Sequence, residues 1–562
     1  MTLRAVDERR ADLRRQVPEW VPRTLDQRLD ECADRWPDRP LAITDEVTLT
    51  YRDVAEQSRR IAAHLIAMGV RPGDRVGMLM ANHPEFLPFK FAIARTGAIA
   101  IPFNFLYRTE ELGYVLEQSG CSVLLTMSGY GDVGAGGIDY LAQLDELAPG
   151  WESAPSLGSL KQVIVLPTDG RSRPGATEYA QLLEPVDSVD SLPHRPGDPG
   201  DMLYTSGSTG SPKGVLVTHD AVLRVAYASA LTRGYDDGRR ILFSLPCYHM
   251  FGYIEGILSA MVVGGAVILQ TGFSAEGYFD GIERHRADDI LCVPTMAVAM
   301  VESPRREDFD LSSLSAILCG SAPAPIWLWE RVEELFGVSE IVTGYGMTEC
   351  GGAMTLTRPE DPLILTSETA GRPKLAGPAG VPGTDEICVY ATIDPLSGAR
   401  LPDGETGELV SYGPATMLEY WGKPAETAEA LSDDRVLRSG DLGRVRADGY
   451  LEVTGRSKEL YKSGGELVMP KEVEDVVGRM EAVSQVFAIG LQDDRWGEIG
   501  ALVIVKAPGG EVTESEVVDH CREHLARFKV PKRVLFVEDE QLPKTPTGKI
   551  QKFRLSGMFS RD

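Results

Sequence analysis

The sequence predicts an α/β protein with a large N-terminal domain, in which helices cover several sheets, and a small α+β domain at the C-terminus. Three observations lead to this prediction. Strand-like apolar runs alternate with helix-like stretches over most of the chain, which is typical of parallel sheets covered by helices. The 562 residues are too many for one core and are expected to divide into units of about 100–200 residues. Beyond residue 447 the pattern changes character.

The first clear helix–strand unit is TYRDVAEQSRRIAAHLIAMG followed by RVGMLM. Val54, Ile61, Leu65 and Met68 recur at helical spacing, and Gly69 ends the pattern. The unit recurs at AIARTGAIAIPFN, where a helix ends and a short apolar strand begins. The stretches APGWESAPSLGSL and PTDGRSRPGATE are interpreted as surface loops.

The last boundary lies in ADGYLEVTGRSKELYKSGG, where a glycine turn and a strand lead into a charged, glycine-rich stretch. The helical segment PKEVEDVVGRM follows. This change of pattern predicts that a separate small domain begins here.

Composition narrows the possible partners. The net charge of -26 argues against nucleic acid or an anionic membrane as the main partner. No apolar run approaches the length of a membrane span, and the charged N-terminus has no signal core. The eight cysteines are dispersed without a C-x-x-C pair, which favours reduced thiols over disulfides or zinc. We therefore expect a cytoplasmic protein.

One glycine-rich stretch, YTSGSTGSPKGV at 204–215, carries the chemistry of a phosphate-binding loop. Glycines let backbone N–H groups converge on an anion, and Lys213 supplies a counter-charge. It is not a Walker A loop, because Lys213 lies between Pro212 and Gly214 and no Ser or Thr follows it. A flexible linker is the alternative, although linkers seldom lie between two strand-like segments.

Three other clusters are weak signals when taken singly: GYGMTE at 344–349, RSGDLG at 438–443 and LPKTPTGKIQK at 542–552. A GYG is more often a turn, Asp441 could be a turn or cap residue, and a basic tail is usually solvated.

Together, and in this order, the clusters resemble the adenylate-forming superfamily of acyl-CoA synthetases, peptide-synthetase adenylation domains and luciferases. The resemblance extends from LTYRDVAEQS to TGKIQK, and GRSKE and PTGK occupy their expected places. The loop matches the phosphate loop of the superfamily, with Ser208 where Thr is common. The resemblance implies an adenylation domain at 1–457 and a mobile C-terminal domain at 458–562.

Activating a carboxylic acid brings a negative nucleophile to a negative phosphate, so cations and N–H donors must neutralise both. The resemblance implies that Glu349 binds Mg²⁺, that Thr348 contacts the α-phosphate, and that Lys549 bridges the carboxylate and that phosphate. Asp441 is suited to accept two ribose hydroxyls. The implied contacts of ATP and AMP are Thr205, Ser206, Gly207, Ser208, Thr209, Gly210, Lys213, Gly320, Ser321, Ala322, Tyr345, Gly346, Met347, Asp441 and Arg456.

The same resemblance implies a second step at which CoA reacts. Lys458 would be the hinge of the small domain, and Gly464 and Gly465 would line the pantetheine entrance. The implied contacts of CoA are Gly464, Gly465, Trp496, Phe528 and Lys532; for Trp496, a place in the core is the alternative.

The acid itself is suggested by LPCYHMFGYIEG. Amino-acid-activating relatives carry an aspartate in this segment, whereas Tyr248 and His249 match the aryl and acyl ligase pattern. His249 would close the carboxylate pocket, a packed core histidine being the alternative. The expected acyl pocket includes Tyr248, Gly344, Gly352 and Ala353, with further apolar lining from VPTMAVAMV. Small residues at 352 and 353 favour a bulky apolar acid, unless Gly352 merely serves a backbone turn.

The sequence therefore predicts an acyl-CoA synthetase that uses ATP, CoA and Mg²⁺, acting as a monomer or homodimer. One alternative catalyses a single half-reaction or loads a carrier-protein thiol. Another is a nonenzymatic nucleotide-binding homologue, which would be expected to lack Lys549, Glu349 or the loop lysine.

Overall fold

The computed structural model describes residues 4–153, 155, 157–186, 191–205, 211–456, 459–463, 466–493, 497–544 and 550–561. Its contacts divide the chain into two compact units. The large unit comprises Met1–Tyr390, Ser411–Arg438 and Asp448–Leu451, and the small unit comprises Ala391–Val410, Ser439–Ala447 and Glu452–Asp562. The boundary predicted between residues 457 and 458 falls outside the described residues and stays a prediction.

The first sheet of the large unit carries the glycine-rich stretch at its edge. Its strand order is β11-β10-β4-β3-β5-β8-β9. The interior strands run parallel, while β10 and β11 form an antiparallel pair. The bounds are β3 Arg75–Leu79, β4 Ile99–Pro102, β5 Val123–Met127, β8 Gln162–Leu166, β9 Thr177–Glu178, β10 Pro199–Thr205 and β11 Lys213–Thr218.

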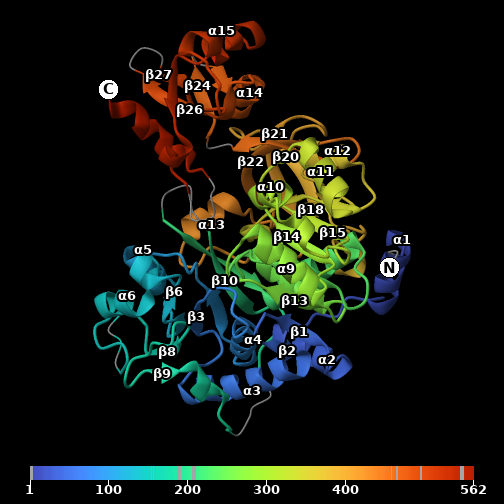
Figure 1. The fold of residues 1–562 in the computed structure, drawn as a ribbon, viewed down its shortest axis with the longest axis vertical. Coiled ribbons are helices and arrows are strands. Elements are labelled where there is room, and N and C mark those ends of the chain that lie inside the picture. The colour runs from blue at the N-terminus through green and yellow to red at the C-terminus, as the bar shows by residue number, and fades with distance from the viewer. Residues whose placement is uncertain are drawn as a thin grey trace. The chain divides into compact units, whose positions relative to one another are not determined.

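The second sheet of the large unit has the order β16-β15-β14-β12-β13-β1-β2 and is parallel apart from the β1–β2 pair. Helices α9 (Ala275–His285), α10 (Pro294–Glu302) and α11 (Ile326–Phe336) share a buried apolar core with its strands (Figure 1). The strands are β1 Pro40–Ile43, β2 Thr48–Thr50, β12 Arg240–Phe243, β13 Ala266–Leu269, β14 Asp289–Cys292, β15 Ala316–Cys319 and β16 Glu340–Val342.

The helix expected at 50–69 is present as α3, Tyr51–Ala67. Its boundaries follow from the sequence, because Thr50 accepts a hydrogen bond from the Asp53 N–H at its start and Gly69 adopts a φ of 97° after its end. Val54, Ile61 and Leu65 are fully buried, as the spacing predicts.

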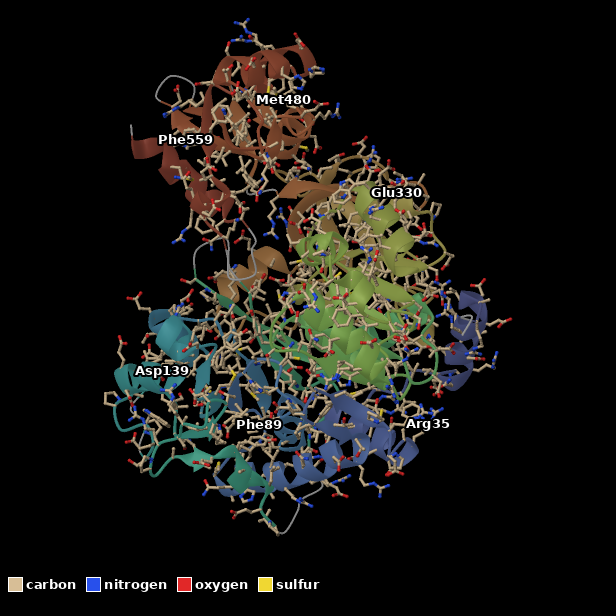
Figure 2. The ribbon with its side chains drawn as sticks, viewed as in Figure 1. Arg35, Phe89, Asp139, Glu330, Met480 and Phe559 are labelled. Carbon is tan, nitrogen blue, oxygen red and sulfur yellow. The ribbon has the colours of Figure 1, made fainter. Side chains whose placement is uncertain are left out.

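The remaining helices of the large unit cover the sheets or lie between them. Phe89 on α4 is fully buried, whereas Glu330 on α11 lies on the surface (Figure 2). Their bounds are α1 Val6–Gln16, α2 Leu25–Arg35, α4 Phe86–Arg95, α5 Thr109–Ser119, α6 Tyr140–Leu147, α7 His219–Arg233, α8 Ser259–Met261, α9 Ala275–His285, α10 Pro294–Glu302, α11 Ile326–Phe336, α12 Leu363–Glu368 and α13 Pro424–Ala430. Helix α7 is buried on almost every side, which marks it as a central helix.

The C-terminal part of the chain mixes strands and helices around its own core. Antiparallel β26 and β27 are extended by β28, which runs parallel to β27. Apolar residues of α14 and α15 pack with these strands. The bounds are β24 Tyr461–Ser463, β25 Glu466–Val468, α14 Pro470–Val477, β26 Val483–Asp493, β27 Gly497–Lys506, α15 Glu514–His524 and β28 Arg533–Val537.

Two smaller sheets complete the strands used below. One has the order β17-β18-β19, with bounds Gly344–Met347, Gly352–Leu356 and Arg372–Pro373. The other has the order β20-β21-β22-β23, with bounds Val389–Ile393, Gly407–Tyr412, Leu437–Val445 and Leu451–Arg456. The predicted fold class, a large α/β part with helix-covered sheets and a small α+β part, is confirmed. Among the described residues, no helix is long and apolar enough to cross a membrane.

Candidate functional site

The two ends of the glycine-rich stretch lie on β10 and β11, which pair as antiparallel neighbours. Thr205 pairs with Lys213, so the sheet holds these two ends together. A Cβ on Gly214 would lie 2.8 Å from the Met202 sulfur, which explains a glycine directly after the lysine. Fixed ends favour a ligand-binding loop over the flexible-linker alternative. Ser206, Gly207, Ser208, Thr209 and Gly210 lie outside the described residues.

A tyrosine that the sequence analysis missed links this hairpin to the GYGMTE cluster. The Lys213 ammonium lies 4.7 Å from the centre of the Tyr420 ring. The Tyr420 hydroxyl donates a 2.8 Å hydrogen bond to the Glu349 carboxylate. Burial and the adjacent Glu349 carboxylate raise the pKa of Tyr420. Two predicted site residues from distant parts of the sequence therefore share one buried aromatic neighbour.

The backbone around Tyr420 is paired to the hairpin. Leu418 N–H donates to the Leu216 carbonyl at 2.8 Å, Leu216 N–H to the Glu419 carbonyl at 3.0 Å, and Trp421 N–H to the Gly214 carbonyl at 2.8 Å. We call residues 415–421 the bracing segment. It runs along the free edge of β11, and its Met417 N–H also donates to the Glu349 carbonyl at 2.8 Å.

The GYGMTE cluster is a strand followed by a tight turn. Gly344 and Gly346 lie on β17, where Cβ atoms would approach the carbonyl oxygens of Thr355 and Gly352 to 2.3 and 1.9 Å. Both glycines are thus required by close pairing with β18, and the alternative reading of GYG as a turn is wrong. Tyr345, between them, is half-buried and packs against Tyr390 at 6.3 Å between ring centroids.

Thr348 and Glu349 form the turn that follows Met347 at the end of β17. Both are buried at 8% exposure. Gly351 closes the turn with a φ of 86° and donates its N–H to the Thr348 carbonyl. Consecutive residues thereby hold a carboxylate and a hydroxyl, both buried, at a strand end.

The loop that contains Gly320, Ser321 and Ala322, three of the implied contacts of ATP and AMP, follows the carboxyl end of parallel strand β15, where ligands bind in open α/β sheets. Gly320 donates its N–H to the Cys292 carbonyl of neighbouring β14 at 3.2 Å. Ser321 adopts a φ of 74°, a conformation that non-glycine residues rarely take and that clusters at functional sites. Ser321 and Ala322 are exposed.

His249 is exposed, so the alternative of a packed core histidine is wrong. Its Nδ1 accepts a 3.2 Å hydrogen bond from the Phe251 N–H, which places the proton of the neutral ring on Nε2. Tyr248, beside it, packs edge-on against Phe105, and burial raises the pKa of Tyr248. His249 lies two residues before a π-helix, Phe251–Leu258, a conformation frequent at functional sites.

The two small residues expected to enlarge the acyl pocket, Gly352 and Ala353, differ in backbone conformation and surroundings. Gly352 adopts a φ of 110°, so its backbone alone favours glycine. A Cβ there would make ordinary contacts with Met250 and Ile254, at 3.4 and 3.8 Å. Ala353 is half-buried on β18. In VPTMAVAMV, Met300 is fully buried in the core of the second sheet.

In the small unit, Asp441 and Arg456 are brought together. Arg456 Nε lies 3.0 Å from the Asp441 carboxylate, with Asp441 buried and Arg456 half-exposed. Asp441 belongs to strand β22, so neither a turn nor a helix cap explains it. Phe528 is half-buried in a single turn of 3-10 helix, and Lys532 N–H pairs with the Gly500 carbonyl.

Five further predicted residues lie outside the described part of the chain: Lys458, Gly464, Gly465, Trp496 and Lys549. Within the described part, no group of three or more His, Cys, Asp or Glu side chains could hold a metal ion. Any metal at Glu349 would therefore need most of its ligands from elsewhere.

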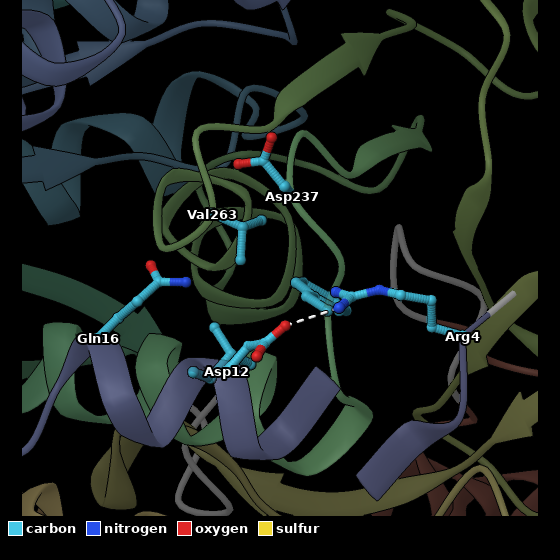
Figure 3. A pocket seen from close by; sticks show the side chains of 7 residues that line it. Arg4, Asp12, Gln16, Asp237 and Val263 are labelled. Atoms are coloured by element: carbon cyan, nitrogen blue, oxygen red, sulfur yellow. Dashed lines mark hydrogen bonds and ion pairs between the residues drawn. The ribbon is translucent and has the colours of Figure 1, made fainter. Parts of the chain in front are cut away.

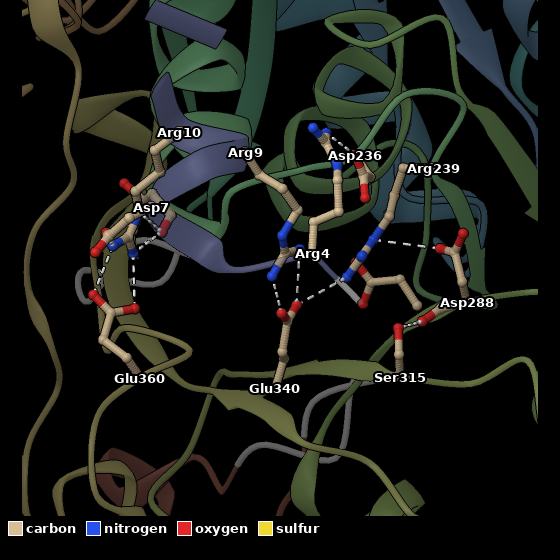
Figure 4. A network of polar contacts seen from close by, with 12 residues as sticks. Arg4, Asp7, Arg9, Arg10, Asp236, Arg239, Asp288, Ser315, Glu340 and Glu360 are labelled. Carbon is tan, nitrogen blue, oxygen red and sulfur yellow. Dashed lines mark hydrogen bonds and ion pairs between the residues drawn. The ribbon is translucent and has the colours of Figure 1, made fainter. Parts of the chain in front are cut away.

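An ion-pair network anchors the strand that leads into GYGMTE. Arg9 on α1 and Arg239 both reach the Glu340 carboxylate at the start of β16 (Figure 4). Arg9 is fully buried. Helix α1 therefore packs against the element that precedes β17.

A small cavity of about 80 Å³ also borders α1, between Asp12, Gln16 and Val263 (Figure 3). Ligand pockets are commonly about 300–1,000 Å³. None of the predicted site residues lines this cavity, so it is not the candidate site.

Comparison with known proteins identifies the family. The chain matches the family model of AMP-binding enzymes over residues 29–421 and that of the AMP-binding enzyme C-terminal domain over residues 472–549. A Mycobacterium tuberculosis ligase for a methyl-dioxo-octahydroindenyl propanoyl group and CoA is 33% identical, covering 95% of this chain and 98% of its own. Feruloyl-CoA synthase of an Amycolatopsis species is 35% identical, covering 93% and 98%.

Solved structures show the same fold. An anthranilate CoA ligase in complex with anthranoyl-AMP matches with a TM-score of 0.78 and 25% identity, covering 96% of this chain and 98% of that one. A Mycobacterium tuberculosis fatty acyl CoA synthetase matches with a TM-score of 0.74 and 29% identity, again covering 96% and 98%.

Proposed function

The chain belongs to the AMP-binding enzyme family, and from this premise we propose that it is an ATP-dependent acid–thiol ligase. It converts a carboxylic acid and ATP to acyl-AMP and pyrophosphate, and then joins the acyl group to CoA with release of AMP. The observation that carries the proposal is the match over nearly the whole chain to relatives named as CoA ligases and synthases. Within the candidate site, the contacts that link Lys213 to Glu349 through Tyr420 also support the proposal.

In the first step, the carboxylate attacks the α-phosphate and pyrophosphate leaves. The Lys213 ammonium, at the exit of the hairpin loop, offsets the charge of the departing pyrophosphate. The Thr348 hydroxyl, buried beside Glu349, contacts the α-phosphate. Lys549 bridges the two reacting anions in this step. The Asp441 carboxylate accepts hydrogen bonds from the ribose hydroxyls. Arg456, which is already paired with Asp441, assists at the ribose or phosphate.

The donors at 348 and 349 fit Mg²⁺. This ion takes oxygen ligands, keeps several waters and is commonly bound through one or two carboxylates plus substrate phosphates. The single buried carboxylate of Glu349, with the Thr348 hydroxyl beside it, matches that pattern. When bound, the ion would neutralise phosphate charge.

In the second step, the CoA thiol attacks the acyl-AMP carbonyl. We propose that the small domain turns about Lys458 and presents Gly464 and Gly465 to the thiol. The proposed contacts of the CoA nucleotide are Trp496, Phe528 and Lys532. This part of the proposal depends on the sequence resemblance.

The acid is proposed to be bulky and largely apolar. Gly352 places no side chain beside Met250 and Ile254, and Ala353 adds only a methyl group to β18. The relatives named for an indenyl propanoyl group and for a feruloyl group act on ring-containing acids. We also propose a cytoplasmic location, because all eight cysteines are free thiols, and a monomer or homodimer.

The test is ATP–pyrophosphate exchange across a panel of carboxylic acids, paired with detection of CoA thioesters. We expect exchange with bulky acids and thioester formation with the same acids. Exchange without thioester would support the half-reaction or carrier-loading alternative. Nucleotide binding without exchange for any acid would support the nonenzymatic alternative and contradict the proposal.

A further inference from the structure

Tyr420 makes contacts unlike those of an ordinary core tyrosine. Only 6% of Tyr420 is exposed, yet its ring faces the Lys213 ammonium and its hydroxyl faces the Glu349 carboxylate. Both charged groups belong to the proposed ATP site. The face of an aromatic ring attracts a cation, and hydrogen bonds to charged groups are stronger than those between neutral groups.

The tyrosine is also held in place from three sides. Its own N–H donates to the Thr427 hydroxyl at 3.0 Å. Residues 418–421 of the bracing segment pair with β11. Arg435 donates to the carbonyls of Thr416 and Leu418, each at 3.2 Å. A side chain supported in this way can fix the groups that it contacts.

Arg435 itself shows that this support has a conformational cost. It adopts a φ of 64°, in the left-handed region that arginine rarely takes. In this conformation its guanidinium reaches the bracing segment. The segment is therefore anchored by a residue held in an unfavourable backbone conformation.

We propose that Tyr420 is a positioning residue for adenylation, which fixes the loop lysine Lys213 through its ring and the metal-binding carboxylate Glu349 through its hydroxyl. The inference rests on the proposed function. It predicts that the two ends of the tyrosine act separately. The hydroxyl controls the metal site, and the ring controls the lysine that faces pyrophosphate.

Two variants separate these contributions. Tyr420→Phe keeps the ring and removes the hydroxyl, and Tyr420→Leu removes both. Tyr412→Phe is the matched control, because Tyr412 is an exposed tyrosine outside the site. Each variant is first compared with the wild type by thermal unfolding, so that loss of folded enzyme is not mistaken for loss of positioning.

The first readout is metal binding without turnover. Binding of Mn²⁺ is followed by electron paramagnetic resonance in the presence of a non-hydrolysable ATP analogue. We expect Tyr420→Phe to weaken Mn²⁺ binding about 10- to 100-fold, the scale of one hydrogen bond to a charged group. Tyr412→Phe should bind Mn²⁺ as the wild type does. Equal Mn²⁺ affinity in Tyr420→Phe and wild type would overturn the role of the hydroxyl.

The second readout is pyrophosphate exchange as a function of Mg²⁺ and pyrophosphate concentration. Tyr420→Phe should raise the Mg²⁺ concentration needed for half-maximal exchange, whereas Tyr420→Leu should also raise KM for pyrophosphate. Thioester formation from supplied acyl-AMP should stay within about 2-fold of wild type. Equal loss in both half-reactions would show a general structural role and overturn the proposal.

Crossed variants complete the test. In a Lys213→Ala background the Phe and Leu variants should behave alike, because the ring has no ammonium to hold. In a Glu349→Gln background, Tyr420→Phe should cost much less than in the wild type. Full additivity in both backgrounds would overturn the coupling. If the wild type shows no pyrophosphate exchange with any acid of the panel, the proposed function fails. Weakened Mn²⁺ binding in Tyr420→Phe would still support the positioning role.

Discussion

The Lys374 ammonium lies 2.5 Å from the Glu255 carboxylate, and both side chains are buried within the large unit. Lys374 also donates to the Ser229 hydroxyl on α7 at 2.6 Å. The other Glu255 oxygen has no hydrogen-bond partner among the described residues. A buried carboxylate therefore depends on one lysine.

The first prediction is that Lys374→Met strongly destabilises the large unit. Removing one member of a buried pair leaves an uncompensated charge and costs about 3–5 kcal/mol. Chemical denaturation monitored by tryptophan fluorescence measures the loss. Arg331→Met is the control, because its pair with Glu334 is largely exposed and its loss should change stability little. Adding Glu255→Leu to Lys374→Met should recover much of the loss, and a single variant as stable as the wild type would contradict the expectation.

The second prediction concerns helix α1, which precedes the matched family region. Arg9→Met removes a buried cation that faces Glu340, but Arg239 still lies 3.6 Å from that carboxylate. We therefore expect a smaller loss, about 1–3 kcal/mol, with faster amide hydrogen exchange in β16. Arg14→Met breaks a half-exposed pair with Asp385 and serves as the control. Identical melting and exchange in the two variants would refute a special role for Arg9.

Local patterns predicted the elements that depend on local interactions. Helix α3 could be predicted from its apolar spacing and from Gly69, because both signals act within a few residues. The hairpin was foreseen only as two strand-like segments around a loop, and its antiparallel pairing brings Thr205 opposite Lys213.

The rest of the site depends on contacts between distant segments. Tyr420 gave no signal, because its role arises only when the bracing segment pairs with β11 and meets Glu349. Gly344 and Gly346 suggested a turn, but strand pairing with β18 is what excludes their side chains. Gly352 suggested an open pocket, yet its φ of 110° gives a backbone reason for glycine.

The third prediction concerns the loop lysine. Lys213→Ala removes a charge that faces the leaving pyrophosphate, so adenylation should slow about 10- to 100-fold. Pyrophosphate exchange at saturating ATP measures the effect. Lys161→Ala, at an exposed lysine beside strand β8 of the same sheet, is the control and should exchange normally. Unchanged kinetics in Lys213→Ala would return the loop to the linker interpretation.

The fourth prediction separates the half-reactions. Lys549 should touch the carboxylate and the α-phosphate only during adenylation. Lys549→Ala should therefore lower acyl-AMP formation by orders of magnitude while sparing thioester formation from supplied acyl-AMP. Single-turnover assays of each step give the comparison.

The opposite variant is Gly465→Leu, which should obstruct the thiol and leave pyrophosphate exchange largely intact. Lys544→Ala is a control for the C-terminal segment, since Lys544 pairs only with Asp539 among the described acids. If Lys549→Ala slowed both steps equally, alternation of the small domain would lose its support. Loss of exchange in Gly465→Leu would show that the thiol entrance is misplaced.

The last prediction concerns the size of the acid. Ala353 lies on β18 beside Gly352, whose missing side chain faces Met250 and Ile254. Each CH₂ of a substrate that is buried there contributes about 0.8 kcal/mol, so a bulky apolar acid should be preferred over acetate or propionate. Ala353→Leu enlarges the half-buried side chain at 353, a position expected in the acyl pocket, and should lower kcat/KM for bulky acids more than for small ones, measured over a size series. Met354→Leu is the matched control, because Met354 is the neighbouring residue of β18, is buried and is not among the residues expected in the acyl pocket. The enlarged-pocket hypothesis fails if the wild type favours the smallest acids. It also fails if Ala353→Leu and Met354→Leu have the same ratio of kcat/KM for bulky acids to kcat/KM for small acids.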